Sequence, residues 1–177
     1  MCTFIILLIS FQKLKTFFGI RESTPSPVVS LSPVGISNGR VVKYSSYKGV
    51  CPLTVKVPNG NQNYYIVLEY VRASSNSIEN RIKKDNRGVN DMSFYVAAGK
   101  SASVSVPVGV YKVYYACGET WYGTKNRFGP NTVYYSSDDL LEFYVDENYY
   151  NGHTLELWLQ TDGNFDRSVI SESQFPD

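Results

Sequence analysis

Histidine is almost absent from this chain of 177 residues, because His153 is the only one. Catalytic groups of the Ser-His-Asp or Cys-His type need an imidazole base, so such chemistry would have to use this residue. His153 follows Asn151-Gly152 in a turn signal, and no nucleophile motif accompanies it. The sequence therefore predicts a protein that is not an enzyme and needs no cofactor, with a hydrolase as the last-ranked alternative.

Cysteine is also scarce, with Cys2, Cys51 and Cys117 as the only examples. Three cysteines are too few for a disulfide scaffold, and their spacing fits no zinc motif. Two interpretations stay open for Cys51 and Cys117. They form a disulfide in an oxidising compartment, or they are small buried apolar residues, which is the favoured alternative.

An excess of charge of one sign is missing as well, since the formal net charge is +1. Residues 1–90 carry a net charge of +8 and residues 91–177 a net charge of −7. A nucleic-acid-binding protein usually concentrates positive charge without such compensation. We therefore expect no nucleic-acid partner.

No apolar run reaches the roughly 20 residues that a membrane-spanning helix needs. Thr3–Phe11 is apolar, but Gln12, Lys13 and Lys15 interrupt the run. A signal peptide would place positive charge before the run and small residues at a cleavage site, and neither is present. Residues 1–22 are thus a degenerate signal or anchor, the end of a longer membrane helix, or an amphipathic helix lying on a membrane or on the domain.

Residues 23–37 contain Pro25, Pro27 and Pro33 among serines. Proline removes backbone donors and stiffens the chain, so this stretch is predicted to be a linker, with an edge strand over 28–31 as the alternative. The predicted organisation is an anchor-like segment (1–22), a linker (23–37) and a folded domain (38–177). We expect a membrane-associated protein whose folded domain is extracytoplasmic.

Tyrosine, in contrast, is abundant, with 15 residues. Tyrosine is amphipathic and favours strands, so this excess predicts sheets with partly wet faces. Short alternating apolar runs recur between turn residues, and no helical periodicity over three turns follows residue 20. The predicted strands span 40–47, 51–57, 64–73, 92–97, 101–106, 110–117, 132–136, 140–145 and 154–161.

These runs predict an all-β fold, an antiparallel β-sandwich of about eight or nine strands with a short apolar N-terminal helical segment. Antiparallel pairing is expected because the connections are too short for crossover helices. In the last strand, Leu155, Leu157 and Leu159 should face the core, while Glu156 and Trp158 face outward. The polar stretch 76–90 is a loop or a short solvated helix.

The step Pro107-Val108-Gly109-Val110-Tyr111-Lys112-Val113 resembles one found in prealbumin-like and carboxypeptidase-regulatory-like sandwiches. Residues 118–123, with Phe128-Gly129, 154–160 and Gly163-Asn164, look like an uncharacterised bacterial β-sandwich domain. That domain lies on the C-terminal side of a membrane segment. The resemblance implies a tethered bacterial module and no catalytic residues.

Aromatic side chains are the main candidates for a binding site: Trp121, Tyr122, Phe128, Trp158 and Tyr114. Such rings stack on sugars or anchor a protein partner, and Trp121 lies in a loop flanked by glycines. The alternative, which we favour for this loop, is that it folds back and caps the domain. The predicted function is a non-enzymatic binding or structural module with an unknown protein or glycan partner. The second candidate is a carbohydrate-binding sandwich.

Acidic residues give weaker candidates. Asp162, Asn164 and Asp166, with Glu172, have part of the oxygen spacing of a calcium loop, but the glycine is misplaced and no flanking helices are expected. A hairpin turn is the favoured alternative, so no metal is predicted. Asp138-Asp139 and Asp146-Glu147 are paired carboxylates without a sign of a cleft, and we interpret them as turn acids.

Overall fold

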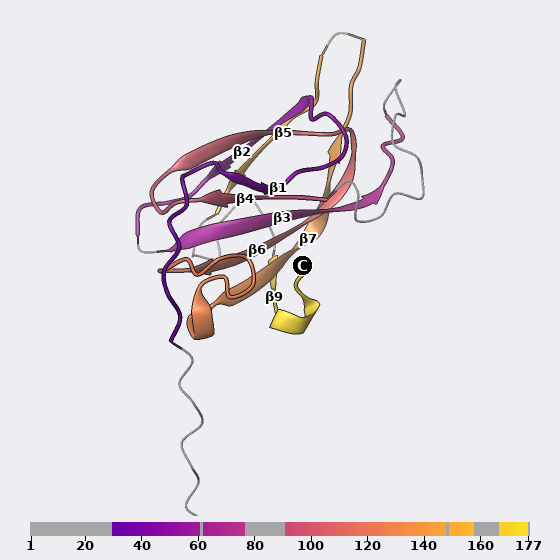
Figure 1. Cartoon of the computed structure of the whole chain (residues 1–177). Helices are drawn as coiled ribbons and strands as arrows, with labels where there is room; N and C mark the ends of the chain where they lie inside the picture. Colours follow the sequence, from indigo (N-terminus) through magenta and orange to yellow (C-terminus); the bar gives the residue numbers. More distant parts are fainter. Residues whose placement is uncertain (1–29, 61, 77–90, 148, 158–166, 177) are drawn as a thin grey trace, which may run out of the picture. The chain divides into compact units, whose positions relative to one another are not determined.

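The computed structural model describes residues 30–60, 62–76, 91–147, 149–157 and 167–176 (Figure 1). The chain divides into two units, Met1–Ser30 and Leu31–Asp177. All the strands described below belong to the second unit. The predicted anchor-like segment, the predicted loop or helix at 77–90, and Leu159 lie outside the described residues. Among the described residues, no helix is long and apolar enough to cross a membrane.

Nine strands and two short 3-10 helices make up the described domain. Six strands form one sheet in the order β1-β4-β3-β6-β7-β9, and three form a second sheet in the order β5-β2-β8. In chain order the elements are β1 (Val41–Lys43), β2 (Cys51–Lys56), β3 (Asn63–Arg72), β4 (Met92–Val96), β5 (Ser101–Val106), β6 (Gly109–Gly118), η1 (Gly129–Asn131), β7 (Val133–Phe143), β8 (His153–Glu156), β9 (Arg167–Ile170) and η2 (Glu172–Gln174).

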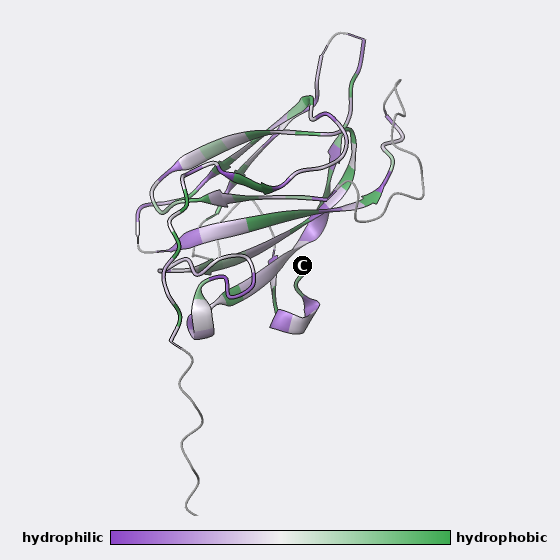
Figure 2. Ribbon diagram, viewed as in Figure 1, coloured by the Kyte–Doolittle hydropathy of each residue, from purple (hydrophilic) through white to green (hydrophobic). Residues whose placement is uncertain are grey.

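The two sheets pack together around one inner core, which confirms the all-β prediction. Alternation along β5 makes this plain, because Ala102, Val104 and Val106 are buried while the intervening serines are exposed. Leu155 and Leu157 are buried in the same core, as predicted. In Figure 2 the hydrophobic residues lie mainly along the strands, whereas η2 is hydrophilic.

The larger sheet buries its other face as well. A second apolar cluster lies there and contains the following buried residues: Tyr65, Val67, Tyr95, Ala116, Trp121, Phe128, Tyr134 and Phe175. We call this cluster the outer aromatic cluster. It is built by the β6–β7 loop and by the C-terminal segment, which both fold over the outer face of the six-stranded sheet.

Three tyrosine doublets supply both sides of this sheet. They are 64–65 on β3, 114–115 on β6 and 134–135 on β7, and consecutive strand residues point to opposite faces. Tyr64, Tyr115 and Tyr135 therefore face the inner core, where the Tyr115 and Tyr135 rings stack at 4.9 Å. The other member of each doublet faces the outer aromatic cluster.

Two predicted strands, 132–136 and 140–145, are one strand, β7. The polar run Ser136–Asp139 suggested a turn, but it crosses a register shift opposite Lys112 and Tyr114. The Ser137 hydroxyl stabilises this irregularity, since it accepts the Val113 amide at 3.1 Å and donates to the Asp139 carbonyl oxygen at 2.7 Å. The chain therefore continues as a strand through residues that usually end one.

Two further features differ from the prediction. β8 pairs with β2 in parallel, whereas every other pair of named strands is antiparallel. The argument from short connections applies only to strands that follow each other, and about a hundred residues separate these two. β9 was not predicted, because its four residues, Arg-Ser-Val-Ile, show no clear alternation.

Substitution of Tyr111 by Phe should stabilise the domain. Tyr111 is fully buried, and its hydroxyl has no hydrogen-bond partner among the described residues. Removal of an unsatisfied buried hydroxyl removes its desolvation cost, so Tyr111→Phe should raise the free energy of unfolding by about 1 kcal/mol. Urea denaturation measures this value.

The matched control is Tyr65→Phe. The Tyr65 hydroxyl is buried and donates to the Ser93 Oγ at 2.9 Å, so its loss should lower the free energy of unfolding by about 1 kcal/mol. A Tyr111→Phe variant that is less stable than the wild type would show that this hydroxyl is satisfied.

Candidate functional site

The loop between β6 and β7 is folded back onto the sheet. Trp121 is only 6% exposed and Phe128 only 4%. The Trp121 ring centroid lies 5.2 Å from that of Tyr65 and 5.3 Å from that of Phe128. These two predicted binding residues therefore belong to the outer aromatic cluster, in agreement with the capping alternative.

Local backbone chemistry explains why the loop closes so tightly. A Cβ atom at Gly118 would lie 2.3 Å from the Phe128 Cβ, so only glycine permits this approach. Gly123 has a φ of +91°, which favours glycine, and its carbonyl accepts the Arg127 amide at 2.7 Å. The Tyr122 amide in turn donates to the Arg127 carbonyl oxygen at 2.7 Å.

Arg127 belongs to this loop, and its cationic side chain is buried. Its guanidinium carbon lies 4.7 Å from the Phe175 ring centroid and 5.5 Å from that of Tyr134. Its Nη1 forms an ion pair with Glu172 Oε1 at 3.6 Å. A guanidinium stacked on aromatic rings away from water is stabilising, so Arg127 joins the loop to the C-terminal segment. Glu172, which the sequence suggested as part of a calcium loop, forms this ion pair instead.

The remaining aromatic candidates do not form an exposed row either. Tyr122 and Tyr114 are half-buried. The Tyr114 hydroxyl donates to Glu69 Oε2 at 3.2 Å, and burial raises the pKa of Tyr114 to about 12. Trp158 lies outside the described residues. Because a sugar ring stacks on an exposed aromatic face, Trp121 and Phe128 are not available for it in this structure.

His153 has a structural environment. Its Nε2 lies 2.8 Å from the Glu142 carbonyl oxygen, and its ring meets Phe143 edge-on at 4.8 Å. These contacts join β8 to the end of β7. Neither of these two contacts is with a nucleophilic side chain.

The two pairs of adjacent acidic residues also form hydrogen bonds with nearby groups. Asp138 Oδ1 accepts the Ser168 hydroxyl at 2.7 Å, and Asp146 Oδ1 accepts the Glu147 amide at 2.6 Å. Within the described ranges, no group of three or more His, Cys, Asp or Glu side chains is placed to hold a metal ion. The calcium-loop candidates Asp162, Asn164 and Asp166 lie outside those ranges.

Cys51 and Cys117 are both buried and free. Cys51 Sγ donates to the Tyr144 carbonyl oxygen, so Cys51 lies at the end of the sheet where Phe143 pairs with Gly109. Cys117 lies eight residues after Gly109 on β6. That separation is about 27 Å along a strand, while a disulfide requires Cα atoms within about 7 Å. The two cysteines therefore do not pair. Burial raises the pKa of both thiols to about 11, which leaves them weak nucleophiles.

Three tyrosines of the hairpin between β7 and β8, Tyr144, Tyr149 and Tyr150, lie beyond the end of the domain where β6 begins and β7 ends. This hairpin extends beyond the strands in Figure 1. Tyr149 (53%) and Tyr150 (58%) are largely exposed, and Tyr144 is half-buried. We call these three residues the tyrosine tip. Tyr44 (69%) is also exposed, but it follows β1, which three strands separate from β7.

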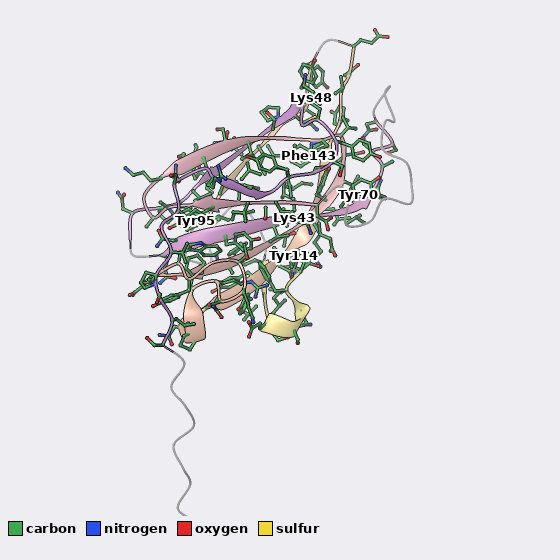
Figure 3. The ribbon with its side chains drawn as sticks, in the orientation of Figure 1. Lys43, Lys48, Tyr70, Tyr95, Tyr114 and Phe143 are labelled. Atoms are coloured by element: carbon green, nitrogen blue, oxygen red, sulfur yellow. The ribbon has the colours of Figure 1, made fainter. Side chains whose placement is uncertain are left out.

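The base of the hairpin that carries the tyrosine tip is held against the start of β2. Cys51 Sγ donates to the Tyr144 carbonyl oxygen, and Gly152 lies against Pro52. Lys48 and Phe143 lie near this same end of the strands in Figure 3. Within the hairpin, Val145 and Tyr150 form a bridge, and the Tyr144 and Tyr149 hydroxyls lie 3.4 Å apart. The tip is thus presented on an ordered frame.

A hollow of about 500 Å³ lies at the opposite end, beside Lys56, Asn59 and Glu156. Its two charged groups are paired with each other at 2.9 Å, and none of the described residues that line it is aromatic. The hollow therefore offers less to a ligand than the tyrosine tip does.

Sequence reasoning missed the tyrosine tip. A signal was present, because 149–150 is a fourth tyrosine doublet and it sits between Asp-Glu-Asn and Asn-Gly, which are turn residues. The other three doublets lie within strands that are buried on both faces. A doublet in a turn has no sheet to cover it, so both rings face solvent.

Searches with this chain found no matching family model, no matching curated protein and no matching solved structure. The resemblance of residues 118–165 to a bacterial sandwich domain therefore stays a prediction. The structure by itself defines an all-β protein of two packed sheets, which is consistent with a β-sandwich.

Removal of the Arg127 side chain should loosen the outer aromatic cluster. Arg127→Ala deletes two ring contacts and the ion pair with Glu172, and should lower the free energy of unfolding by about 2–3 kcal/mol. Trp121 should also become more accessible to acrylamide. Quenching is measured in a Trp158→Phe background, where Trp121 is the only tryptophan.

Lys125→Ala is the control, because Lys125 is an exposed residue of the same loop. It should change neither the stability nor the quenching. Equal quenching of Trp121 with and without the Arg127 side chain would contradict the proposed role of this cation.

Proposed function

We propose that this domain is a non-catalytic binding module that engages a partner protein through the tyrosine tip. The observation that carries the proposal is the exposure of two consecutive tyrosines, Tyr149 and Tyr150, on a hairpin that extends beyond one end of the strands. Exposed tyrosines among Ser, Asn and Gly supply large, rigid contact area at a low entropic cost, as they do in antibody paratopes.

The ring geometry supports a protein partner over a glycan. The Tyr144 and Tyr149 rings meet at an interplanar angle of 64°, with centroids 6.2 Å apart. A glycan chain stacks best on rings that share a plane, whereas an irregular protein surface fits rings that stand at angles to each other. The carbohydrate-binding alternative gains no support from the described aromatic side chains.

The chain enters the described domain at the end opposite the tyrosine tip. The Val34 amide donates to the Trp121 carbonyl oxygen at 2.8 Å, and Leu31 lies beside Gly129. Both contacts are at the end of β6 and β7 opposite the tip. The described residues that lead into the domain, from Leu31 on, therefore leave the tyrosine tip uncovered.

The proposal keeps the predicted tethered bacterial organisation. The apolar residues 1–22 would act as the anchor, the linker 23–37 as a spacer, and the domain would be extracytoplasmic. The resemblance of residues 118–165 to a domain that follows a membrane segment supports the same organisation.

Site-specific photo-cross-linking tests this function. A benzoylphenylalanine introduced at Tyr150 in the full chain should give a discrete cross-linked protein adduct in cells of the source organism. The same probe at Ser103, which is exposed on the outer face of β5, is the control and should give none. The adduct should disappear when Tyr149 is changed to Ser. No adduct from Tyr150, or one of equal yield from Ser103, would contradict the proposal.

A further inference from the structure

We infer that the tyrosine tip recognises an arginine-bearing, positively charged segment of its partner protein. This inference rests on the proposed function and adds the chemistry of the partner. It follows from three features of the tip, namely its acidic residues, the orientation of its rings and the way this protein already binds guanidinium groups.

Two carboxylates lie within the hairpin of the tip. Asp146 and Glu147 are placed between Tyr144 and Tyr149, and Glu147 is exposed. The hydrogen bond with Tyr149 raises the pKa of Tyr144, and the charges of Asp146 and Glu142 act in the same direction. The Tyr144 hydroxyl thus lies in the field of nearby carboxylates, and negative charge beside an aromatic ring favours a cation there.

Glu142 contributes less to this field. Its carboxylate accepts hydrogen bonds from the Ser74 hydroxyl at 2.8 Å and the Asn76 side-chain amide at 2.8 Å. Asp146 and Glu147 are therefore the acidic groups that a ligand at the tip would meet.

The protein already uses tyrosine rings to hold guanidinium groups. The Arg167 guanidinium carbon lies 4.8 Å from the Tyr135 ring centroid, and Arg127 lies 5.5 Å from that of Tyr134. In each case a planar guanidinium lies over a tyrosine of a doublet. The doublet at 149–150 offers the same rings to solvent, with carboxylates beside them, so arginine suits the tip better than the compact lysine ammonium does.

Basic groups at this end set the competing field. Lys48 is exposed on the β1–β2 connection, Arg72 donates to the Ala73 carbonyl oxygen, and Lys43 pairs with Asp91 at 3.8 Å. The connection between β3 and β4 also starts and ends here, and its sequence carries Lys83 and Lys84. Removal of these charges should leave binding of a cationic segment unchanged or strengthen it.

Selection from a random peptide library against the immobilised full chain tests the inference. Peptides whose binding requires Tyr149 and Tyr150 should be enriched in arginine. Hexa-arginine should then bind in calorimetric titration at least about fivefold more tightly than hexalysine. Asp146→Asn with Glu147→Gln should weaken hexa-arginine binding about tenfold, and Tyr149→Ala with Tyr150→Ala should abolish it.

Two controls separate this chemistry from general electrostatic attraction. Lys48→Ala, and Lys83→Gln with Lys84→Gln, should not weaken the binding of hexa-arginine. An unchanged circular-dichroism spectrum verifies the fold of each variant.

These outcomes distinguish a failure of the arginine inference from a failure of the proposed function. Peptides that need the tyrosines but are neutral or acidic, or binding that survives Asp146→Asn with Glu147→Gln, would overturn the arginine inference and leave the proposed function standing. If no selected peptide depends on Tyr149 and Tyr150, the proposed function is overturned together with the inference.

Discussion

Burial of the six-stranded sheet on both faces is the constraint on which the rest of this structure depends. One face packs against the three-stranded sheet, and the other is covered by the β6–β7 loop and the C-terminal segment. Consecutive tyrosines make this possible, since each doublet gives one ring to each face. The aromatic excess of the sequence is therefore mostly structural, and this leaves the tyrosine tip as the exception that requires a function.

The outer aromatic cluster also explains why the loop predicted to bind a ligand is buried. Trp121 and Phe128 are large apolar groups in a loop that glycines allow to close, so burial against the sheet is more favourable than exposure. Arg127 and Glu172 bring polar groups into this interface and join it to the end of the domain. Those side chains stabilise the fold, and the proposed binding site lies at the opposite end.

Much of the fold was predictable from the sequence, because β2 and β5 follow simple apolar alternation and β3, β4 and β6 are largely apolar runs bounded by turn residues. The single long strand β7 was not, since Ser136–Asp139 has the composition of a turn and only the Ser137 hydroxyl reveals how the strand continues. Pairing of β2 with β8 depends on contacts across about a hundred residues. The burial of Trp121 and Phe128, two of the candidate binding residues, is decided by packing, because residue type indicates hydrophobicity but only the packed structure shows which rings remain exposed.

Nitration of the folded full chain by tetranitromethane, read out by peptide mass spectrometry, tests the central claim most directly. Exposed tyrosines react, whereas buried ones are shielded and have raised pKa values, as burial gives Tyr115 a pKa of about 12. The account predicts rapid nitration of Tyr149 and Tyr150, and none of Tyr64 and Tyr65 before unfolding. Nitration of Tyr65 as fast as that of Tyr149 would show that the outer face of the sheet is open, and would contradict the account.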